Sequence, residues 1–214
     1  MNLEFLDFVT FIRFYILLTF ILAIILRDKK KYYHKMVLLI IFIGLINEFL
    51  SAFLSFQGIS IKINTNIYAL VNSSLWIYIL FKNFKNNFYL LLIIFYLIFG
   101  VSNLIFMGNL VQFNVTNFIV GAIIYLIIFI IESYNHLKKE NLNFFLCNNY
   151  ILLSAPVLFF IGFSLMLSFR SKELTSCLIL DDIKLYTLVG NFVNIVYYTL
   201  INIYILKERK SQNG

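Results

Sequence analysis

Apolar residues along this chain fall into seven continuous runs of roughly 20 residues, separated by short polar segments. A helix of about 20 apolar residues spans the bilayer core, whereas barrel strands alternate over about 10 residues. Lipid offers no partner for backbone hydrogen bonds, so continuous runs of this length must be helical. The pattern predicts an all-α, seven-transmembrane-helix bundle that forms one domain, residues 1–214. The predicted helices cover residues 5–26, 36–57, 64–82, 88–107, 113–133, 148–169 and 185–206.

The connections between these runs are short, which makes consecutive helices antiparallel neighbours. The longest connection on the outer side is residues 170–184. It could hold a short amphipathic segment that acts as a lid, or it is only a connection.

Two charged side chains interrupt the apolar runs, Arg13 in the first and Glu48 in the second. At 1.5 Å per residue, each lies about 12 Å from the same bilayer surface. A charge at that depth is costly unless it faces the bundle interior and finds a partner. Equal depth on adjacent helices predicts that Arg13 and Glu48 are close. They form either a purely structural ion pair or part of a site that meets a ligand, ion or proton.

Other polar residues recur at helical spacing, so each set lies on one face of its helix. One set is Gly44, Glu48, Ser51 and Ser55, and another is Thr187, Asn191, Asn194, Tyr198 and Asn202. Two further sets are Tyr96, Gly100 and Asn103, and Asn117, Gly121, Tyr125 and Glu132. Lipid cannot pair polar groups, so each face is expected to point into the bundle.

Converging polar faces predict a cavity in the outer half of the bundle. Its floor is expected near Tyr125 and Tyr198, and its inner half is expected to be closed by Phe, Ile and Leu side chains. The candidate ligand-binding residues share one depth band and are Arg13, Glu48, Asn72, Asn103, Asn191 and Asn194. The alternative for each asparagine is a structural role, because polar side chains commonly join membrane helices at about 0.6 kcal/mol per hydrogen bond.

Charge supports a membrane protein and gives an orientation. The chain is 62% hydrophobic and only 13% charged, whereas soluble domains carry about 25% charged residues. Of its 17 Lys and Arg residues, 12 fall on one side of the predicted bundle and four on the other, with Arg13 inside. The positive-inside rule places the N-terminus outside and the C-terminus in the cytoplasm. The net charge of +7 is therefore read as a topology signal that favours anionic headgroups, and no nucleic-acid partner is expected.

Catalytic and metal chemistry find little support. The only histidines, His34 and His136, lie in predicted cytoplasmic connections, so no metal site is expected within the membrane. Lys184 and Lys207 flank the last helix, which leaves no mid-span lysine for a Schiff base. No phosphate-binding loop or nucleophile elbow is present. We expect no cofactor and no catalytic residue, which favours a protein that is not an enzyme.

Three short motifs are similar to those of a known group of proteins. They are the acidic second helix (Gly44 to Glu48), the Asn-Ile-Tyr opening of the third helix (Asn66 to Tyr68) and the asparagines of the last helix (Asn191 to Asn194). The chain resembles an uncharacterised family of small seven-helix bacterial inner-membrane proteins. The resemblance implies a multi-pass protein of the bacterial cytoplasmic membrane and no particular activity. The order of helices is also similar to that of heptahelical receptors, at the level of fold alone.

The leading functional hypothesis is a heptahelical membrane protein of sensor or receptor type, with an outward-facing polar site. It would bind a small ligand from the outer side and pass its signal to a membrane or cytoplasmic protein partner. One alternative is a small-solute transporter or channel that uses the polar interior as its path. Another is a membrane-disrupting effector of a defence operon, and an intramembrane enzyme ranks last.

Overall fold

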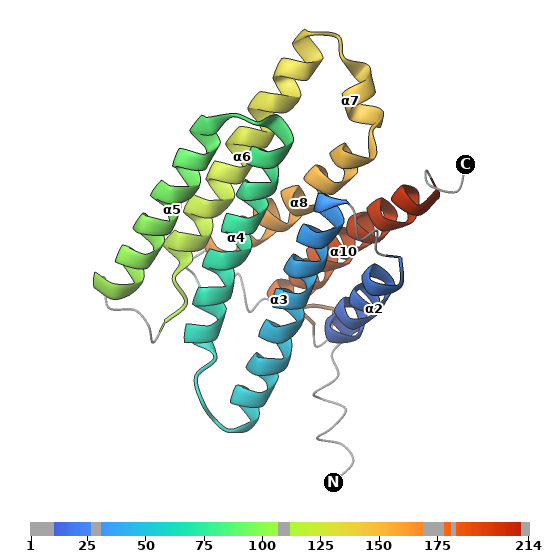
Figure 1. Ribbon diagram of the computed structural model, residues 1–214. Helices are drawn as coiled ribbons and strands as arrows, with labels where there is room; N and C mark the ends of the chain where they lie inside the picture. The colour runs from blue at the N-terminus through green and yellow to red at the C-terminus, as the bar shows by residue number, and fades with distance from the viewer. Residues whose placement is uncertain (1–10, 27–30, 107–111, 169–177, 181–182, 211–214) are drawn as a thin grey trace.

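The computed structural model describes residues 11–26, 31–106, 112–168, 178–180 and 183–210. Within these ranges the chain forms eight helices and two short strands, which confirms the all-α prediction (Figure 1). The helices are α2 (Phe11–Ile25), α3 (Tyr32–Phe56), α4 (Lys62–Phe84), α5 (Asn87–Phe106), α6 (Val115–Lys138), α7 (Leu142–Leu146), α8 (Asn148–Ser168) and α10 (Leu185–Lys210). The strands β1 (Leu178–Leu180) and β2 (Ile183–Lys184) pair antiparallel within the connection before α10.

Helix α4 lies at the centre of the bundle, in contact with α3, α5, α6 and α8 (Figure 1). Around it, α3 packs against α2, α2 against α10, α10 against α8, and α8 against α6. Helix α5 lies at the edge, where it packs against α4 and α6. This order brings the first and last long helices together and separates α5 from both.

The side chains of α4 account for its central place. Its completely buried side chains are Ser73, Trp76, Ile77, Ile79 and Leu80. The amides of Asn66 and Asn72 are also buried. A helix that contacts protein rather than lipid can carry polar groups, because neighbouring helices supply hydrogen-bond partners. Helix α4 is not among the helices apolar enough to cross a membrane by composition, and it is the helix that its neighbours enclose.

Five helices of the described chain are long and apolar enough to cross a membrane, namely α3, α5, α6, α8 and α10. Helix α2 is apolar but shorter in its described part, because residues 5–10 of the predicted first helix lie outside the described residues. Large apolar side chains such as Phe14, Phe53, Leu91 and Ile130 are exposed on the outside of the bundle. Length and composition therefore show a helical, multi-pass membrane protein whose outer surface suits a lipid bilayer.

Several helices extend past the predicted bounds, always into polar sequence. Helix α3 begins at Tyr32, α6 continues to Lys138, and α10 continues to Lys210. The short helix α7 lies in a segment predicted to be a connection. The end of an apolar run marks the end of lipid contact, whereas the hydrogen bonds of the helix can continue into polar sequence. His136 and Lys138 lie in the last turn of α6. Basic side chains at this position interact favourably with the negative end of the helix dipole.

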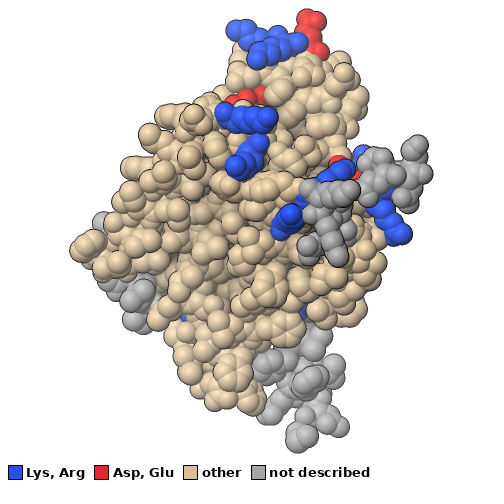
Figure 2. All heavy atoms as spheres, in the orientation of Figure 1, with Lys and Arg blue, Asp and Glu red and all other residues tan. Residues whose placement is uncertain are grey.

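Basic side chains gather at one end of the bundle. This end is formed where α3 begins and where α4, α6 and α10 end, and it carries Lys35, Lys82, Lys138, Lys207 and Arg209. Figure 2 shows Lys and Arg over the upper part of the visible face and an almost uncharged lower part. Lys62 and Lys184 lie at the opposite end, where α4 and α10 begin. We call these the basic end and the opposite end.

Candidate functional site

A cavity of about 580 Å³ lies between the helices toward the opposite end of the bundle. Its lining comes from α2, α3, α4, α6, α8 and α10, so residues from both halves of the sequence meet there. Lys62 and Thr65 of α4 and Tyr186 and Thr187 of α10 are part of the lining, which places the cavity near the first turns of both helices. Five of the six candidate ligand-binding residues line it: Arg13, Glu48, Asn72, Asn191 and Asn194.

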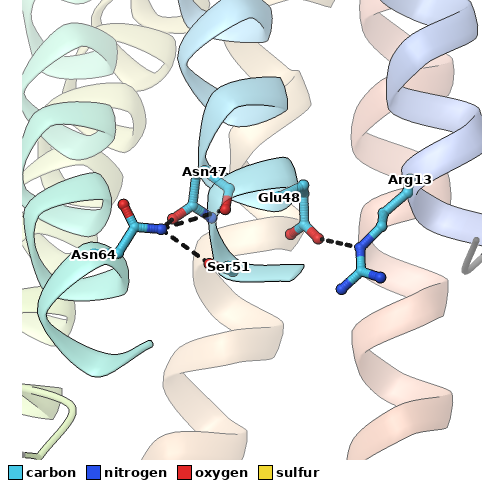
Figure 3. A network of polar contacts seen from close by, with 5 residues as sticks. All are labelled: Arg13, Asn47, Glu48, Ser51 and Asn64. Atoms are coloured by element: carbon cyan, nitrogen blue, oxygen red, sulfur yellow. Dashed lines mark hydrogen bonds and ion pairs between the residues drawn. The ribbon is translucent and has the colours of Figure 1, made fainter. Parts of the chain in front are cut away.

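Arg13 and Glu48 form an ion pair across the α2–α3 contact (Figure 3). The guanidinium Nε of Arg13 donates to Oε2 of Glu48 over 3.3 Å, so the predicted proximity is confirmed. The side chains remain 22% and 33% exposed, respectively. Both residues also line the cavity. The pair is therefore part of the cavity wall and is not sealed within a helix–helix contact.

A second set of polar contacts supports the same stretch of α3. The side-chain amide of Asn64 donates to Oδ1 of Asn47 and to Oγ of Ser51, each over 2.9 Å (Figure 3). These bonds tie the start of α4 to the turns of α3 on either side of Glu48. They fix the position of Glu48 along the helix axis relative to α4.

Asn72 presents a buried acceptor at the cavity. Its side chain is 2% exposed, it lines the cavity, and within the described chain its Oδ1 atom has no hydrogen-bond partner. A buried, unpaired carbonyl oxygen costs about 1–3 kcal/mol, so a donor that reaches this atom would recover much of that cost. Asn72 is thus the lining residue that most clearly requires a partner.

Two tyrosine hydroxyls meet beside Gly44, one helical turn before Glu48. A Cβ atom on Gly44 would lie 3.6 Å from the hydroxyl oxygens of both Tyr68 and Tyr198. All three residues line the cavity. Because glycine has no side chain, both hydroxyl groups can lie against the backbone of α3 and remain close to the Glu48 carboxylate.

Aromatic side chains close the bundle beneath the cavity. Trp76 and Tyr125 are completely buried and Tyr197 nearly so. The indole Nε1 of Trp76 donates to the hydroxyl of Tyr197 over 3.1 Å, and the hydroxyl of Tyr125 donates to the carbonyl of Leu153 over 2.5 Å. Tyr198 lines the cavity as expected for its floor, whereas Tyr125 lies among the buried aromatics and is not part of the lining.

Asn103 is the exception among the candidate residues, because it is not part of the cavity lining. Its amide donates to Oδ1 of Asn117 over 2.7 Å and to Oδ1 of Asn114 over 3.2 Å. Asn117 in turn donates to the carbonyl of Gly100 over 2.9 Å, and Asn66 accepts from the backbone of Asn114 over 2.7 Å. This network joins α4, α5 and α6. Asn103 therefore has the structural role that was the alternative for each asparagine.

Replacing Asn103 with leucine is expected to destabilise the protein. The change removes the donor from Oδ1 of Asn117, a buried residue, at a cost of about 1–3 kcal/mol. For a chain of this size, that loss lowers the thermal midpoint by roughly 2–10 °C. Unfolding in detergent measures the change. The matched control is Asn191→Leu, because Asn191 is exposed in the cavity wall; an equal loss in both variants would contradict this account of the network.

Two further lining residues, Tyr68 and Asn47, lie at sequence positions that relate them to the candidate residues. Tyr68 lies one turn before Asn72, so the two share a face of α4. Asn47 lies directly before Glu48 and lines the cavity beside it. The aromatic residues Phe118, Phe159 and Phe163 had no usable signal, because the chain contains 25 phenylalanines and most could face lipid as readily as a cavity.

The side chains that line the cavity are suited to recognising a ligand. Among the residues that the structure describes, no three His, Cys, Asp or Glu side chains gather so that they could hold a metal ion. The cavity instead combines one ion pair, several amides and hydroxyls, and an aromatic wall. Ligand sites commonly have this composition, with a few polar groups placed in a largely apolar pocket.

Comparison with known proteins identifies no family for this chain. It matches no protein-family model, no curated protein and no solved structure. The resemblance to a family of small bacterial inner-membrane proteins thus stays a prediction. Length, composition and fold show a helical, multi-pass membrane protein.

Proposed function

We propose that this chain is a seven-helix membrane protein that binds a small ligand from outside the cell, in the manner of a sensor or receptor. The seven spans are α2, α3, α4, α5, α6, α8 and α10, in the cytoplasmic membrane of a bacterium. The observation that carries the proposal is the cavity of about 580 Å³ whose wall contains the Arg13–Glu48 pair. Typical small-molecule sites have volumes of roughly 300–1,000 Å³.

The orientation follows from the two ends of the bundle. Cytoplasmic connections of membrane proteins carry the excess of Lys and Arg. The basic end therefore faces the cytoplasm, and the opposite end, where the cavity lies, faces outward. A charged pair at this depth is costly in lipid, and membrane proteins commonly keep such residues where a ligand, ion or proton reaches them.

Binding is favoured over passage by the closed inner half. The aromatic layer that contains Trp76, Tyr125 and Tyr197 lies between the cavity and the basic end and is almost completely buried. A transporter would have to open this layer in each cycle. Saturable solute flux in proteoliposomes would favour the transporter alternative, and non-selective leakage would favour the membrane-disrupting one.

Helix α10 offers a route from the cavity to the cytoplasm. Asn194 and Tyr198 line the cavity, and the same helix continues to Glu208, which accepts hydrogen bonds from Lys31 and Asn148. The helix is 26 residues long, which corresponds to about 39 Å. A ligand that shifts the outer part of α10 would therefore alter the contacts of Glu208 at the basic end, where a partner protein can sense the change.

Cysteine labelling from outside the cell tests the position of the cavity. In a chain whose Cys147 and Cys177 have been replaced, a membrane-impermeant thiol reagent is expected to label Asn191→Cys and Asn194→Cys in intact cells. Asn103→Cys is the matched control, because it lies at a similar predicted depth but outside the cavity lining. Protection of both lining positions, or labelling only after the cells are opened, would remove the outward-facing site.

A further inference from the structure

A second hollow, an apolar groove of about 610 Å³, lies at the basic end of the bundle. Five side chains of α6, between Phe129 and Leu137, line it together with three of α7 and with Tyr150 of α8. We propose that the groove binds an anionic phospholipid, with one acyl chain in the groove and the phosphate at Lys138. The groove and the ligand cavity share no lining residue, so this site is independent of the proposed function.

The floor of the groove is aromatic and held in place by contacts within the chain. The ring centroids of Phe129 and Tyr150 are 5.7 Å apart, and those of Phe145 and Tyr150 are 5.1 Å apart. Helix α7 is held against α6 by Phe144, whose ring stacks on that of His136 with the centroids 3.9 Å apart. Packing of three helices therefore forms the groove before any lipid enters it.

The walls of the groove expose large apolar side chains. Ile130, Leu137, Leu142 and Leu146 are between 57% and 79% exposed. The three leucines lie beyond residue 133, where the apolar run of α6 ends, in a segment that is otherwise rich in polar residues. Exposed apolar surface of this kind marks contact with a membrane or a partner. A hydrocarbon chain within the groove would be covered by apolar atoms on several sides, which a convex helix surface cannot provide.

The order of residues along α6 matches the order of chemical groups in a phospholipid. Ile130, Tyr134 and Lys138 follow each other at intervals of four residues, so they lie on one face of the helix. Ile130 and Tyr134 line the groove, and Lys138 is the last residue of α6, one turn further on. Tyrosine is typical of the membrane interface, and a lysine side chain extends from apolar surface toward the headgroups. A lipid whose acyl chain lies along the groove would thus bring its phosphate to Lys138.

The charge at the headgroup position favours an anionic lipid. Lys138 and Lys139 are followed directly by Glu140, so two positive charges and one negative leave an excess of positive charge in this turn. Figure 2 shows basic side chains together with acidic ones at the top of the molecule, over the turn between α6 and α7. The described lining of the groove itself has no charged side chain. Charge and hydrocarbon surface are therefore separated here as they are in a phospholipid, and basic sites beside membrane helices bind anionic headgroups.

Native mass spectrometry of the purified full-length chain, released from detergent micelles, tests the inference. The probes are dioleoylphosphatidylglycerol, which is anionic, and dioleoylphosphatidylcholine, which has the same acyl chains and no net charge. We expect the first phosphatidylglycerol to bind at least about fivefold more tightly than the first phosphatidylcholine, since a lysine near anionic lipid contributes about that factor. Lys138→Gln should remove most of this preference. Lys207→Gln is the matched control, because Lys207 is exposed at the same end but no residue of α10 lines the groove.

A second pair of variants tests the place of the acyl chain. Leu137→Ser should weaken both lipids by a similar factor, whereas Leu91→Ser, at a similarly exposed position of α5, should weaken neither. Equal binding of the two lipids, or the same loss of preference in Lys207→Gln, would overturn the contact between the phosphate and Lys138. Glycerol 3-phosphate that binds as tightly as phosphatidylglycerol would mean that the phosphate is held without the groove. A lipid-free dimer that is lost in Leu137→Ser would assign the groove to a second copy of the chain.

Discussion

Replacing Glu48 with glutamine is expected to lower the stability of the protein substantially, and so is replacing Arg13 with glutamine. Removal of one partner from a fully buried ion pair costs about 3–5 kcal/mol. Because the two side chains are 22% and 33% exposed at the cavity, we expect roughly half of that cost. Trp76 is the only tryptophan and is completely buried, so its fluorescence during thermal unfolding in detergent reports the loss.

The double variant distinguishes a pair from two independent charges. With both residues replaced by glutamine, neither charge of the pair remains, and the two amides can bond to each other. We expect a recovery of about 0.5–3 kcal/mol relative to the sum of the single losses. Strictly additive losses would mean that each charge is stabilised by something other than its partner.

Gly121→Ala should disrupt the packing of α4, α5 and α6. A Cβ atom at this position would lie 2.5 Å from the hydroxyl oxygen of Tyr96 and 2.9 Å from the Cβ atom of Ser73. The hydroxyl of Tyr96 cannot move away freely, because it donates to the carbonyl of Asn117 over 3.1 Å. Overpacking of this kind costs about 1–3 kcal/mol, and Gly121→Leu should prevent assembly of the bundle.

Gly190→Ala is the matched control for this prediction. Both glycines are helical, but a Cβ atom on Gly190 would meet its nearest neighbour, the ring of Phe163, at 3.8 Å, which is ordinary contact. Alanine is also favoured over glycine in a helix by about 0.5–1 kcal/mol. Thermal unfolding should therefore show a clear loss for Gly121→Ala and none for Gly190→Ala. Equal behaviour of the two variants would argue against a close approach of the three helices.

The helices could be predicted because lipid imposes the same requirement on every span. Each predicted run corresponds to a helix of the described chain, and apart from the short helix α7, which was not predicted, the errors lie at the ends. Tyr32 begins α3 four residues before the predicted start at residue 36, and Lys138 ends α6 five residues after residue 133. Hydropathy reports contact with lipid, so it gives no information on turns of helix that extend beyond the membrane.

Arg13 and Glu48 could be paired from sequence because two conditions together limit the possible partners of each charge. A charge at membrane depth requires a partner, and consecutive helices joined by a short connection must be neighbours. Asn103 was placed with the cavity residues from its depth alone. Depth does not determine the position of a helix around the bundle. Because α5 packs against α4 and α6, its polar face meets Asn117 and is kept from the cavity.

In the seven-span arrangement, the position of α4 has a consequence for how the protein is made. Insertion of a single helix into the membrane depends on its own hydropathy, and α4 is not among the five long helices that satisfy this criterion alone. Its neighbours in the sequence, α3 and α5, do satisfy it. They can therefore hold α4 across the bilayer from both sides during synthesis, before Asn66 forms its hydrogen bonds with Gln112 and Asn114. The helix on which the finished bundle depends most is the one that enters the membrane with the most assistance.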